Sequence, residues 1–322
     1  MGNKFAEKNE NKGLLTAIFG KPTPAKASGI VFSLAAVLPT ALSFLFLLVI
    51  QAFGLTEEGY EKTDWYLYVS YLITPCAFFL VAAFYFLWRK GSFTATVKRQ
   101  KCHPKYYLIA LLLQVGLFSF SELNTYFLEF LSRFGYKPAE INLPSMDGVG
   151  IVGVLFVIAV LPAIFEEIVF RGLLLDGLHS FGRVGAILLC GGLFALYHQN
   201  PVQTVYQFCC GAAFALVAVR AGSILPTVLA HFLNNALIII LTKFGIASFP
   251  VPVFIVIVSV SAVCLAATLT YLIFFDKKEE PFSAETLAER KKERVCFGAC
   301  SAFGVILLGV TWLVALFVGI KG

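Results

Sequence analysis

Charged residues are scarce in this sequence. Asp, Glu, Lys and Arg together make up 14% of its 322 residues, against about 25% in a soluble globular protein. Hydrophobic residues make up 59%, including 33 Phe, and the mean hydropathy is +0.83. So little polar surface cannot cover a chain of this size in water, and the composition excludes a cytosolic domain.

Several sequence signatures of soluble enzymes are also missing. The eight cysteines include no CxxC pair, so no zinc knuckle is indicated. Neither an HExxH segment nor a GxSxG elbow occurs, and these are the usual signatures of a zinc peptidase and of a serine hydrolase. The apolar runs do not alternate with polar residues as the strands of a membrane barrel do, so they predict helices.

Nine apolar runs are long enough to cross a bilayer, which takes about 20 residues for a helix. Only helices or closed barrels satisfy the backbone in lipid, so we expect an all-α, polytopic membrane helix bundle. The runs are Ala27–Leu55, Trp65–Trp88, Tyr106–Leu131, Val149–Leu178, Val184–Asn200, Val202–Val219, Ser223–Leu241, Val251–Phe275 and Val295–Ile320.

The charges of the connecting segments alternate along the chain. Lys and Arg concentrate before the first run, after the second and after the eighth, and the intervening loops are acidic or weakly charged. Cytoplasmic loops carry an excess of Lys and Arg. The pattern therefore predicts a multi-pass protein of the cell membrane with a cytoplasmic N-terminus. The basic loops should contact anionic membrane lipids and indicate no nucleic-acid partner.

This interpretation divides the chain into four segments. Residues 1–26 form a cytoplasmic N-terminal segment and residues 27–275 form the membrane helical core. Residues 276–294 form a charged cytoplasmic loop, and residues 295–322 form a C-terminal transmembrane helix. Within the charged loop we expect a short surface helix with Ser283 as its N-cap.

The fourth run contains the segment FEEIVFRG, with Glu166, Glu167 and Arg171. Charges inside a membrane are costly, so this cluster is a functional hypothesis by default, although side chains at a helix end can also snorkel to water. At about 100° per residue, Glu167 and Arg171 share a helix face and can pair, and Glu166 is rotated away from them. Pro162 has no N–H for the carbonyl of Ile158, which predicts a kink or polar opening near Glu166.

Other polar side chains occur in charge-free apolar runs. His198 ends the segment FALYH, and HFLNN contains both His231 and Asn235 on one helix face. Each can be a structural residue by itself, but together with Glu166 they favour one shared site. Counted along the helices, His198 lies about 9 Å deeper than His231, so a shared site requires helix tilt or a deeper start of the helix that carries His198.

Two hydrolytic chemistries fit these residues. In the first, Glu166 and His198 hold and deprotonate a water molecule, and His231 and Asn235 donate hydrogen bonds to the oxyanion. In the second, Glu166, His198 and His231 bind zinc, with water as the fourth ligand. Both chemistries hydrolyse an acyl bond, and the sequence leaves the choice between them open.

The segments EEIVFR, FALYH and HFLNN resemble, in order, the three motifs of the CAAX protease and bacteriocin-processing (CPBP) family of intramembrane proteases. They lie within residues 149–241. The resemblance implies an eight-helix core with a conical cavity, to which the run at 295–320 would be an addition. It also implies a catalytic Glu166, a water-positioning His198, an oxyanion-binding His231 and Asn235, and a structural pair of Glu167 and Arg171.

The resemblance implies an endopeptidase acting on a membrane-associated peptide, including prenylated CaaX substrates. Members of the family are often called metalloproteases, so zinc is an open possibility, although a glutamate-activated water without metal is also argued. The alternative is a non-proteolytic bacteriocin-immunity or scaffold protein with the same fold. A transporter with a Glu–His proton relay is a third hypothesis, but it predicts inverted repeats, and the sequence contains none.

Overall fold

The computed structural model describes residues 23–89, 101–139, 141–246, 249–276 and 286–321. Those residues contain helices and turns but no strand. Nine of their helices are long and apolar enough to cross a membrane. The prediction of an all-α, polytopic membrane bundle is therefore confirmed.

Most of the predicted runs correspond to one helix, and two are interrupted. The long helices are α2 (Pro24–Ala52), α3 (Asp64–Arg89), α9 (Gly182–Tyr197), α10 (Thr204–Ala221), α11 (Leu225–Lys243), α12 (Val251–Thr270) and α13 (Leu287–Lys321). The third run is α5 (Lys105–Leu117), the 3₁₀ turn η2 (Phe118–Phe120) and α6 (Ser121–Ser132). Shorter elements are the 3₁₀ turns η1 (Tyr60–Lys62) and η5 (His179–Phe181), and the π-helical η6 (Tyr271–Phe275) that extends α12.

The fourth run, which carries the charged cluster, contains two π-helical segments. It consists of α7 (Gly150–Val154), the π-helical η3 (Leu155–Val160), α8 (Leu161–Glu167) and the π-helical η4 (Ile168–Leu174). π-Helical segments inside longer helices are rare and are frequently found at functional sites. Pro162, from which a kink or polar opening was predicted, stands at the start of α8, directly after η3.

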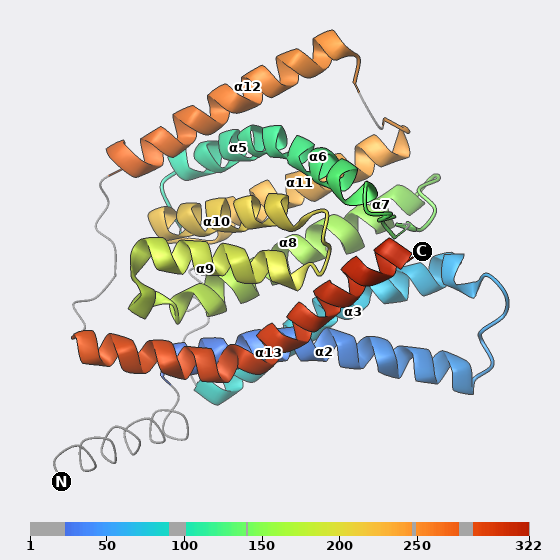
Figure 1. Ribbon diagram of the computed structural model, residues 1–322, viewed down its shortest axis with the longest axis horizontal. Helices are drawn as coiled ribbons and strands as arrows, with labels where there is room; N and C mark the ends of the chain where they lie inside the picture. Colours follow the sequence, from blue (N-terminus) through green and yellow to red (C-terminus); the bar gives the residue numbers. More distant parts are fainter. Residues whose placement is uncertain (1–22, 90–100, 140, 247–248, 277–285, 322) are drawn as a thin grey trace.

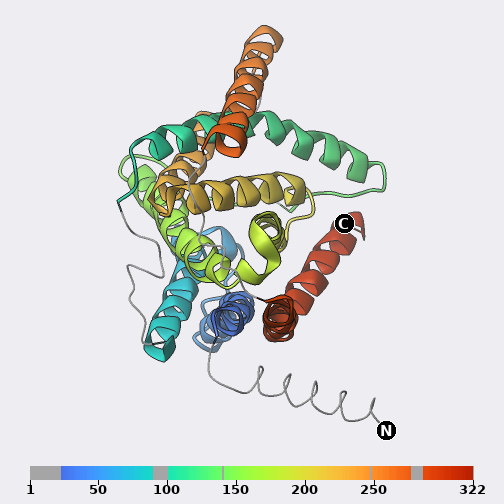
Figure 2. The same ribbon diagram turned by 90° about the vertical axis from the view of Figure 1, so that its left-hand side faces the viewer.

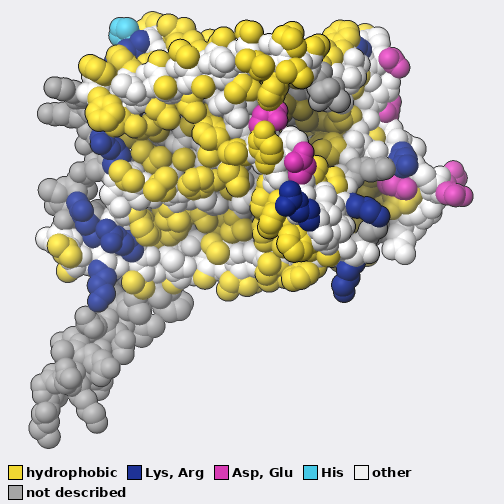
Figure 3. All heavy atoms as spheres, turned by 45° about the horizontal axis from the view of Figure 1, so that its top comes forward, with side chains coloured by type: hydrophobic (Ala, Val, Ile, Leu, Met, Phe, Trp, Pro, Cys, Tyr) yellow, Lys and Arg dark blue, Asp and Glu magenta, His cyan; other side chains and the backbone are white. Residues whose placement is uncertain are grey.

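The spanning helices run back and forth along the long axis of the molecule (Figure 1). α2 and α13 begin at the same end, and the C-terminus lies toward the opposite end. In Figure 3, the Asp and Glu side chains in view lie from the middle toward one end, Lys and Arg side chains lie at both ends, and a broad apolar surface covers much of the remaining face. This apolar surface is the one expected of a protein whose middle faces lipid.

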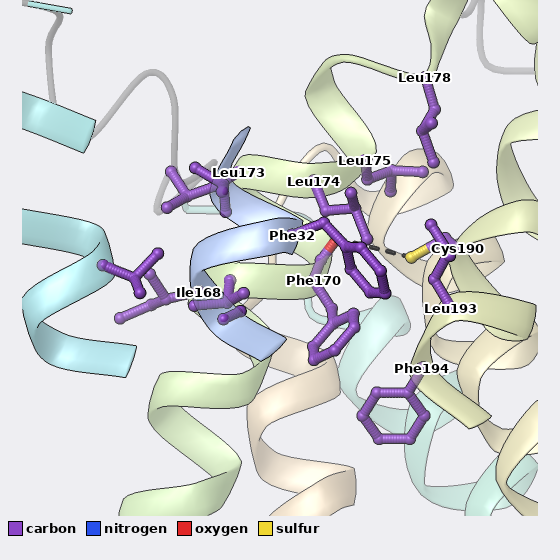
Figure 4. Packing of buried hydrophobic residues seen from close by; sticks show 14 of the residues in the cluster. Phe32, Ile168, Phe170, Leu173, Leu174, Leu175, Leu178, Cys190, Leu193 and Phe194 are labelled. Atoms are coloured by element: carbon purple, nitrogen blue, oxygen red, sulfur yellow. Dashed lines mark hydrogen bonds between the residues drawn. The ribbon is translucent and has the colours of Figure 1, made fainter. Parts of the chain in front are cut away.

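α9 and α10 lie in the middle of the bundle, between α5 on one side and α2 with α13 on the other (Figures 1 and 2). They approach so closely that a methyl group built on Gly211 would lie 2.8 Å from the Cα of Gly191. The main core cluster joins them to η4 and α2 through buried aromatic and aliphatic side chains, including Phe32, Phe170 and Phe194 (Figure 4). α12 packs on α5, where a methyl group built on Gly116 would lie 2.7 Å from the backbone of Leu265, and its N-terminal part projects from the bundle (Figure 2).

The C-terminal helix begins earlier than the sequence predicts. α13 starts at Leu287, inside the segment predicted to be a loop, and continues without interruption to Lys321. Its first turn is closed by a capping box. The Oγ1 of Thr286 accepts from the N–H of Glu289 at 3.3 Å, and the carboxylate of Glu289 accepts from the N–H of Thr286 at 2.9 Å. The predicted cap, Ser283, lies outside the described residues.

α13 packs along α2, the first spanning helix. The Oγ of Ser33 on α2 donates to the carbonyl of Cys300 at 2.7 Å and accepts from the N–H of Gly304 at 3.2 Å. Near its C-terminal end, Trp312 donates from Nε1 to the Oγ1 of Thr204 at 2.9 Å. The ninth helix is thus joined to α10 by a hydrogen bond as well as to α2.

Candidate active site

Four elements from the second half of the chain surround a polar cavity of about 60 Å³. A cavity needs about 10–15 Å³ to hold a water molecule, so this one has room for water. α8, the C-terminal end of α9, α10 and α11 contribute the walls. The lining residues are Glu166, Phe194, His198, Gln207, Cys210, Phe214, His231, Asn234 and Asn235. The structure therefore brings Glu166, His198, His231 and Asn235 together around one space, although their chemical roles stay predictions.

Glu167 and Arg171 form an ion pair behind this cavity. The Nη1 of Arg171 lies 2.8 Å from the Oε1 of Glu167, and both side chains are fully buried. The Nη2 of Arg171 donates to the carbonyl of Gly211 at 3.2 Å, and its guanidinium carbon lies 4.3 Å from the ring centre of Phe194. A buried arginine needs such partners, because an uncompensated charge inside a protein is very costly.

His231 lies between the two glutamates. Its Nδ1 is 2.9 Å from the Oε1 of Glu167, and its Nε2 is 3.8 Å from the Oε2 of Glu166. Because an ionised carboxylate only accepts hydrogen bonds, Nδ1 must carry the proton of the shorter contact. His231 can therefore donate toward the cavity from Nε2 only as the imidazolium. In that form, the positive charges of His231 and Arg171 balance the negative charges of the two glutamates.

His198 is oriented by its own helix. Its Nδ1 lies 2.9 Å from the carbonyl oxygen of Phe194, one turn earlier. A carbonyl only accepts, so we assign the proton to Nδ1, which leaves the Nε2 of the neutral ring as an acceptor. The ring of Phe194 packs edge-on against that of His198 with 4.6 Å between their centres. His198 is thus suited to accept a hydrogen bond from a molecule in the cavity.

Glu166 and Glu167 each have a buried carboxylate oxygen, Oε2, with no hydrogen-bond partner among the described residues. Glu167 is held by Arg171 and His231 through its other oxygen, and of the two glutamates only Glu166 lines the cavity. The 3.8 Å separation of Glu166 from His231 is an ion contact rather than a hydrogen bond. Glu166 is 8% exposed and lines the cavity. A carboxylate oxygen in this state can accept a proton from water.

Asn235 and the adjacent Asn234 both face the cavity. The Nδ2 of Asn235 donates to the carbonyl of Ile158 at 3.3 Å, and the Nδ2 of Asn234 donates to the Oδ1 of Asn235 at 3.1 Å. Sequence reasoning singled out Asn235 but gave Asn234 no role. The available signal was the second amide in HFLNN, because polar side chains in a membrane helix usually have a partner or a function.

Phe194 and Gln207 are two further residues of the cavity that were not singled out from the sequence. Phe194 contacts Arg171 through its ring and His198 through its carbonyl. The structure places Gln207 on the cavity wall.

The arrangement does not support the zinc alternative. Within the ranges that the structure describes, no group of three or more His, Cys, Asp or Glu side chains is placed so that it could hold a metal ion. Glu166, His198 and His231 have the right chemistry for such a site. In their present positions, however, they do not form one, and we derive no step through a metal.

Residues 148–237 match the family model of the type II CAAX prenyl endopeptidase Rce1-like domain. The match contains Glu166, His198, His231 and Asn235, and it agrees with the family resemblance of the three motifs. No curated protein and no solved structure matches the chain. The molecule is thus a multi-pass helical membrane protein, and the residues that line its polar cavity lie within the stretch that matches the Rce1-like model.

Proposed function

We propose that this protein is an intramembrane endopeptidase that hydrolyses a membrane-associated peptide. The observation that carries the proposal is the buried Oε2 of Glu166, which has no hydrogen-bond partner among the described residues and faces a water-sized cavity. Two histidines and three side-chain amides line the same cavity. The Rce1-like match over the same residues supports peptide hydrolysis over other hydrolytic chemistry.

The positions of the donors and acceptors support the following reaction. A water molecule binds between Glu166 and the Nε2 of His198. Glu166 takes one proton while the oxygen attacks the peptide carbonyl carbon. The negative oxygen of the tetrahedral intermediate accepts hydrogen bonds from His231 and Asn235. Glu166 then passes its proton to the leaving amine nitrogen as the C–N bond breaks, which returns the carboxylate to its initial state.

The proposed substrate is anchored at the membrane, with lipidated CaaX-like peptides as the first class to test. A cavity of about 60 Å³ is too small for a peptide, so the substrate must separate the surrounding helices as it enters. The end of the bundle at which α2 and α13 begin is the proposed cytoplasmic side of the cell membrane. The N-terminus lies on that side in this topology.

The test is cleavage of a farnesylated CaaX peptide by purified protein in lipid nanodiscs, followed by mass spectrometry. The same peptide without the lipid tests whether lipidation is required. Release of a C-terminal fragment by the wild type and its loss in Glu166→Gln would support the proposal. Equal cleavage by both proteins would refute the role of Glu166. Binding without cleavage by either protein would favour the non-proteolytic scaffold or immunity function.

A further inference from the structure

A chain of side-chain amides crosses the bundle beside the cavity. It begins at Gln114 on α5, whose Nε2 donates to the Oδ1 of Asn234 at 2.7 Å. The Nδ2 of Asn234 donates to the Oδ1 of Asn235 at 3.1 Å, and the Nδ2 of Asn235 donates to the carbonyl of Ile158 at 3.3 Å. Three helical segments that are far apart in the sequence are connected in this way.

The backbone end of this chain fixes its direction. Amide oxygen and nitrogen are assigned from their hydrogen bonds, but the carbonyl of Ile158 can only accept. Asn235 must therefore turn its nitrogen toward Ile158 and its oxygen toward Asn234. Asn234 must in turn present its nitrogen to Asn235 and its oxygen to Gln114. Reversing any one amide would place two oxygens or two N–H groups against each other.

Pro162 explains why the carbonyl of Ile158 is available to a side chain. In a regular α-helix that carbonyl would accept from the N–H four residues later, and Pro162 has no N–H to donate. The position lies in η3, directly before α8. The proline next to the charged motif thereby provides the acceptor that anchors Asn235.

A second donor holds the middle of the chain. The hydroxyl of Tyr206 on α10 lies 2.9 Å from the Oδ1 of Asn234, so two donors converge on this oxygen. Gln114 is 4% exposed and Tyr206 is 6% exposed. Hydrogen bonds in such poorly solvated surroundings are electrostatically stronger than in water, and an amide with the wrong orientation is correspondingly costly.

We infer that Asn234 is a positioning residue that locks the amide of Asn235 with only its N–H groups available to a reacting oxyanion. This inference rests on the proposed function. The oxygen of Asn235 is occupied by Asn234, and one of its two N–H bonds is occupied by Ile158. The remaining N–H is the only group of that amide free to stabilise negative charge. Without Asn234, only the 3.3 Å hydrogen bond to Ile158 holds the amide, so it rotates more easily to present an oxygen that repels the oxyanion.

The first experiment compares Asn234→Leu with Asn234→Asp in the peptide-cleavage assay, at pH 8 and pH 5.5. Removing an oxyanion donor outright costs about 100- to 1,000-fold in kcat, so loss of its positioning should cost about 10- to 100-fold, with KM nearly unchanged. The carboxylate of the Asp variant cannot donate to Asn235, but its protonated form can. The kcat of this variant relative to wild type should therefore rise about tenfold at pH 5.5.

The ratio to wild type isolates the effect from the other titrating groups near Asn234. Glu166, His198, His231 and Cys210 line the same cavity, Tyr206 donates to Asn234, and all five are present in both proteins. The leucine side chain of Asn234→Leu cannot be protonated. The ratio of its kcat to that of wild type should therefore be the same at both pH values. A kcat of Asn234→Leu within twofold of wild type would overturn the inference, and so would an Asp variant whose ratio stays constant with pH.

Two tyrosines provide a matched pair of milder variants. Tyr206→Phe removes one donor to Asn234 and should lower kcat by about three- to tenfold. Tyr106 is equally buried and belongs to the same core cluster, but its hydroxyl donates to Asp276 at 2.8 Å, in the segment that follows α12. Tyr106→Phe should leave kcat within twofold of wild type. Equal losses of kcat in both variants would assign Tyr206 a merely structural role and contradict the positioning of Asn235 through the amide chain.

A stability measurement separates this inference from the proposed function. If the two amides are hydrogen-bonded, the losses in melting temperature of Asn234→Leu and Asn235→Leu should not add up in the double variant. Additive losses in melting temperature would overturn the coupling of Asn234 to Asn235, whatever the cleavage activity of the variants. If wild type cleaves no peptide, the proposed function fails, and the melting temperatures still decide whether the amides are coupled. Should the Leu variants not fold, the nearly isosteric Asn234→Asp retains the pH test.

Discussion

The same small change in two adjacent glutamates should affect two different properties of the protein. Glutamine replaces one carboxylate oxygen by an NH₂ group and leaves the shape of the side chain unchanged. Glu166→Gln removes the proposed base, which has an oxygen without a hydrogen bond within the described ranges. Glu167→Gln removes the countercharge of Arg171, with which Glu167 forms a fully buried 2.8 Å ion pair.

The magnitudes of the two effects follow from these environments. Loss of a general base lowers kcat by about 100- to 10,000-fold, which corresponds to roughly 3–5 kcal/mol of activation free energy. Glu166→Gln should reach this range with a melting temperature close to wild type. Removing one partner of a buried ion pair costs about 3–5 kcal/mol. At roughly 2 °C per kcal/mol, Glu167→Gln should lower the melting temperature by about 6–10 °C.

Two measurements on the same preparations test this contrast. The initial rate of peptide cleavage is measured well below the melting temperature of the weaker variant, and thermal unfolding is followed by tryptophan fluorescence in the same lipid nanodiscs. A Glu166→Gln variant with more than a tenth of wild-type kcat would refute a base role for Glu166. A Glu167→Gln variant with the same melting temperature as wild type would refute the structural role of the ion pair.

Three further predictions concern the surroundings of the site. Trp312→Phe removes the Nε1 donor to Thr204 and should lower the melting temperature by about 2 °C, the loss of one ordinary hydrogen bond; an unchanged melting temperature would show that the bond contributes nothing. Gly191→Ala should destabilise the protein by about 1–3 kcal/mol, because the new methyl group would lie 2.8 Å from the backbone nitrogen of Ala212. Its neighbour Gly192 has no atom within 4 Å of that position, so Gly192→Ala is the control and should unfold at the wild-type temperature or above. Finally, incubation with a chelator should leave the cleavage rate unchanged, since no described group of side chains is placed to hold a metal; loss of activity that added zinc restores would contradict this.

The local features of the site could be predicted from the sequence because they depend on helix geometry alone. Glu167 and Arg171 are four residues apart, and this spacing brings them together in an α-helix and still does so at the start of η4. The irregularity near Glu166 follows from the missing N–H of Pro162. The spanning helices follow from the length of the apolar runs, since a backbone in lipid must bond to itself.

The meeting of residues from different helices depends on tilt, crossing and close approach, which one helix cannot specify. Counting residues along the helices placed His198 about 9 Å deeper than His231, yet both line one cavity. α9 carries His198 at its very end and turns back into α10 short of the far end of the bundle (Figure 1). Only the tertiary structure shows that this short hairpin brings the two histidines together.

The role proposed for Asn234 is likewise a property of the assembled bundle. Its sequence position gives only an amide beside Asn235 in an apolar helix. The direction in which that amide points is set by a donor on α5, a donor on α10 and a carbonyl of η3. The sequence thus determines which side chains each helix offers, because helical periodicity is local. Packing decides which of them meet, because hydrogen bonds between helices require contacts across many intervening residues.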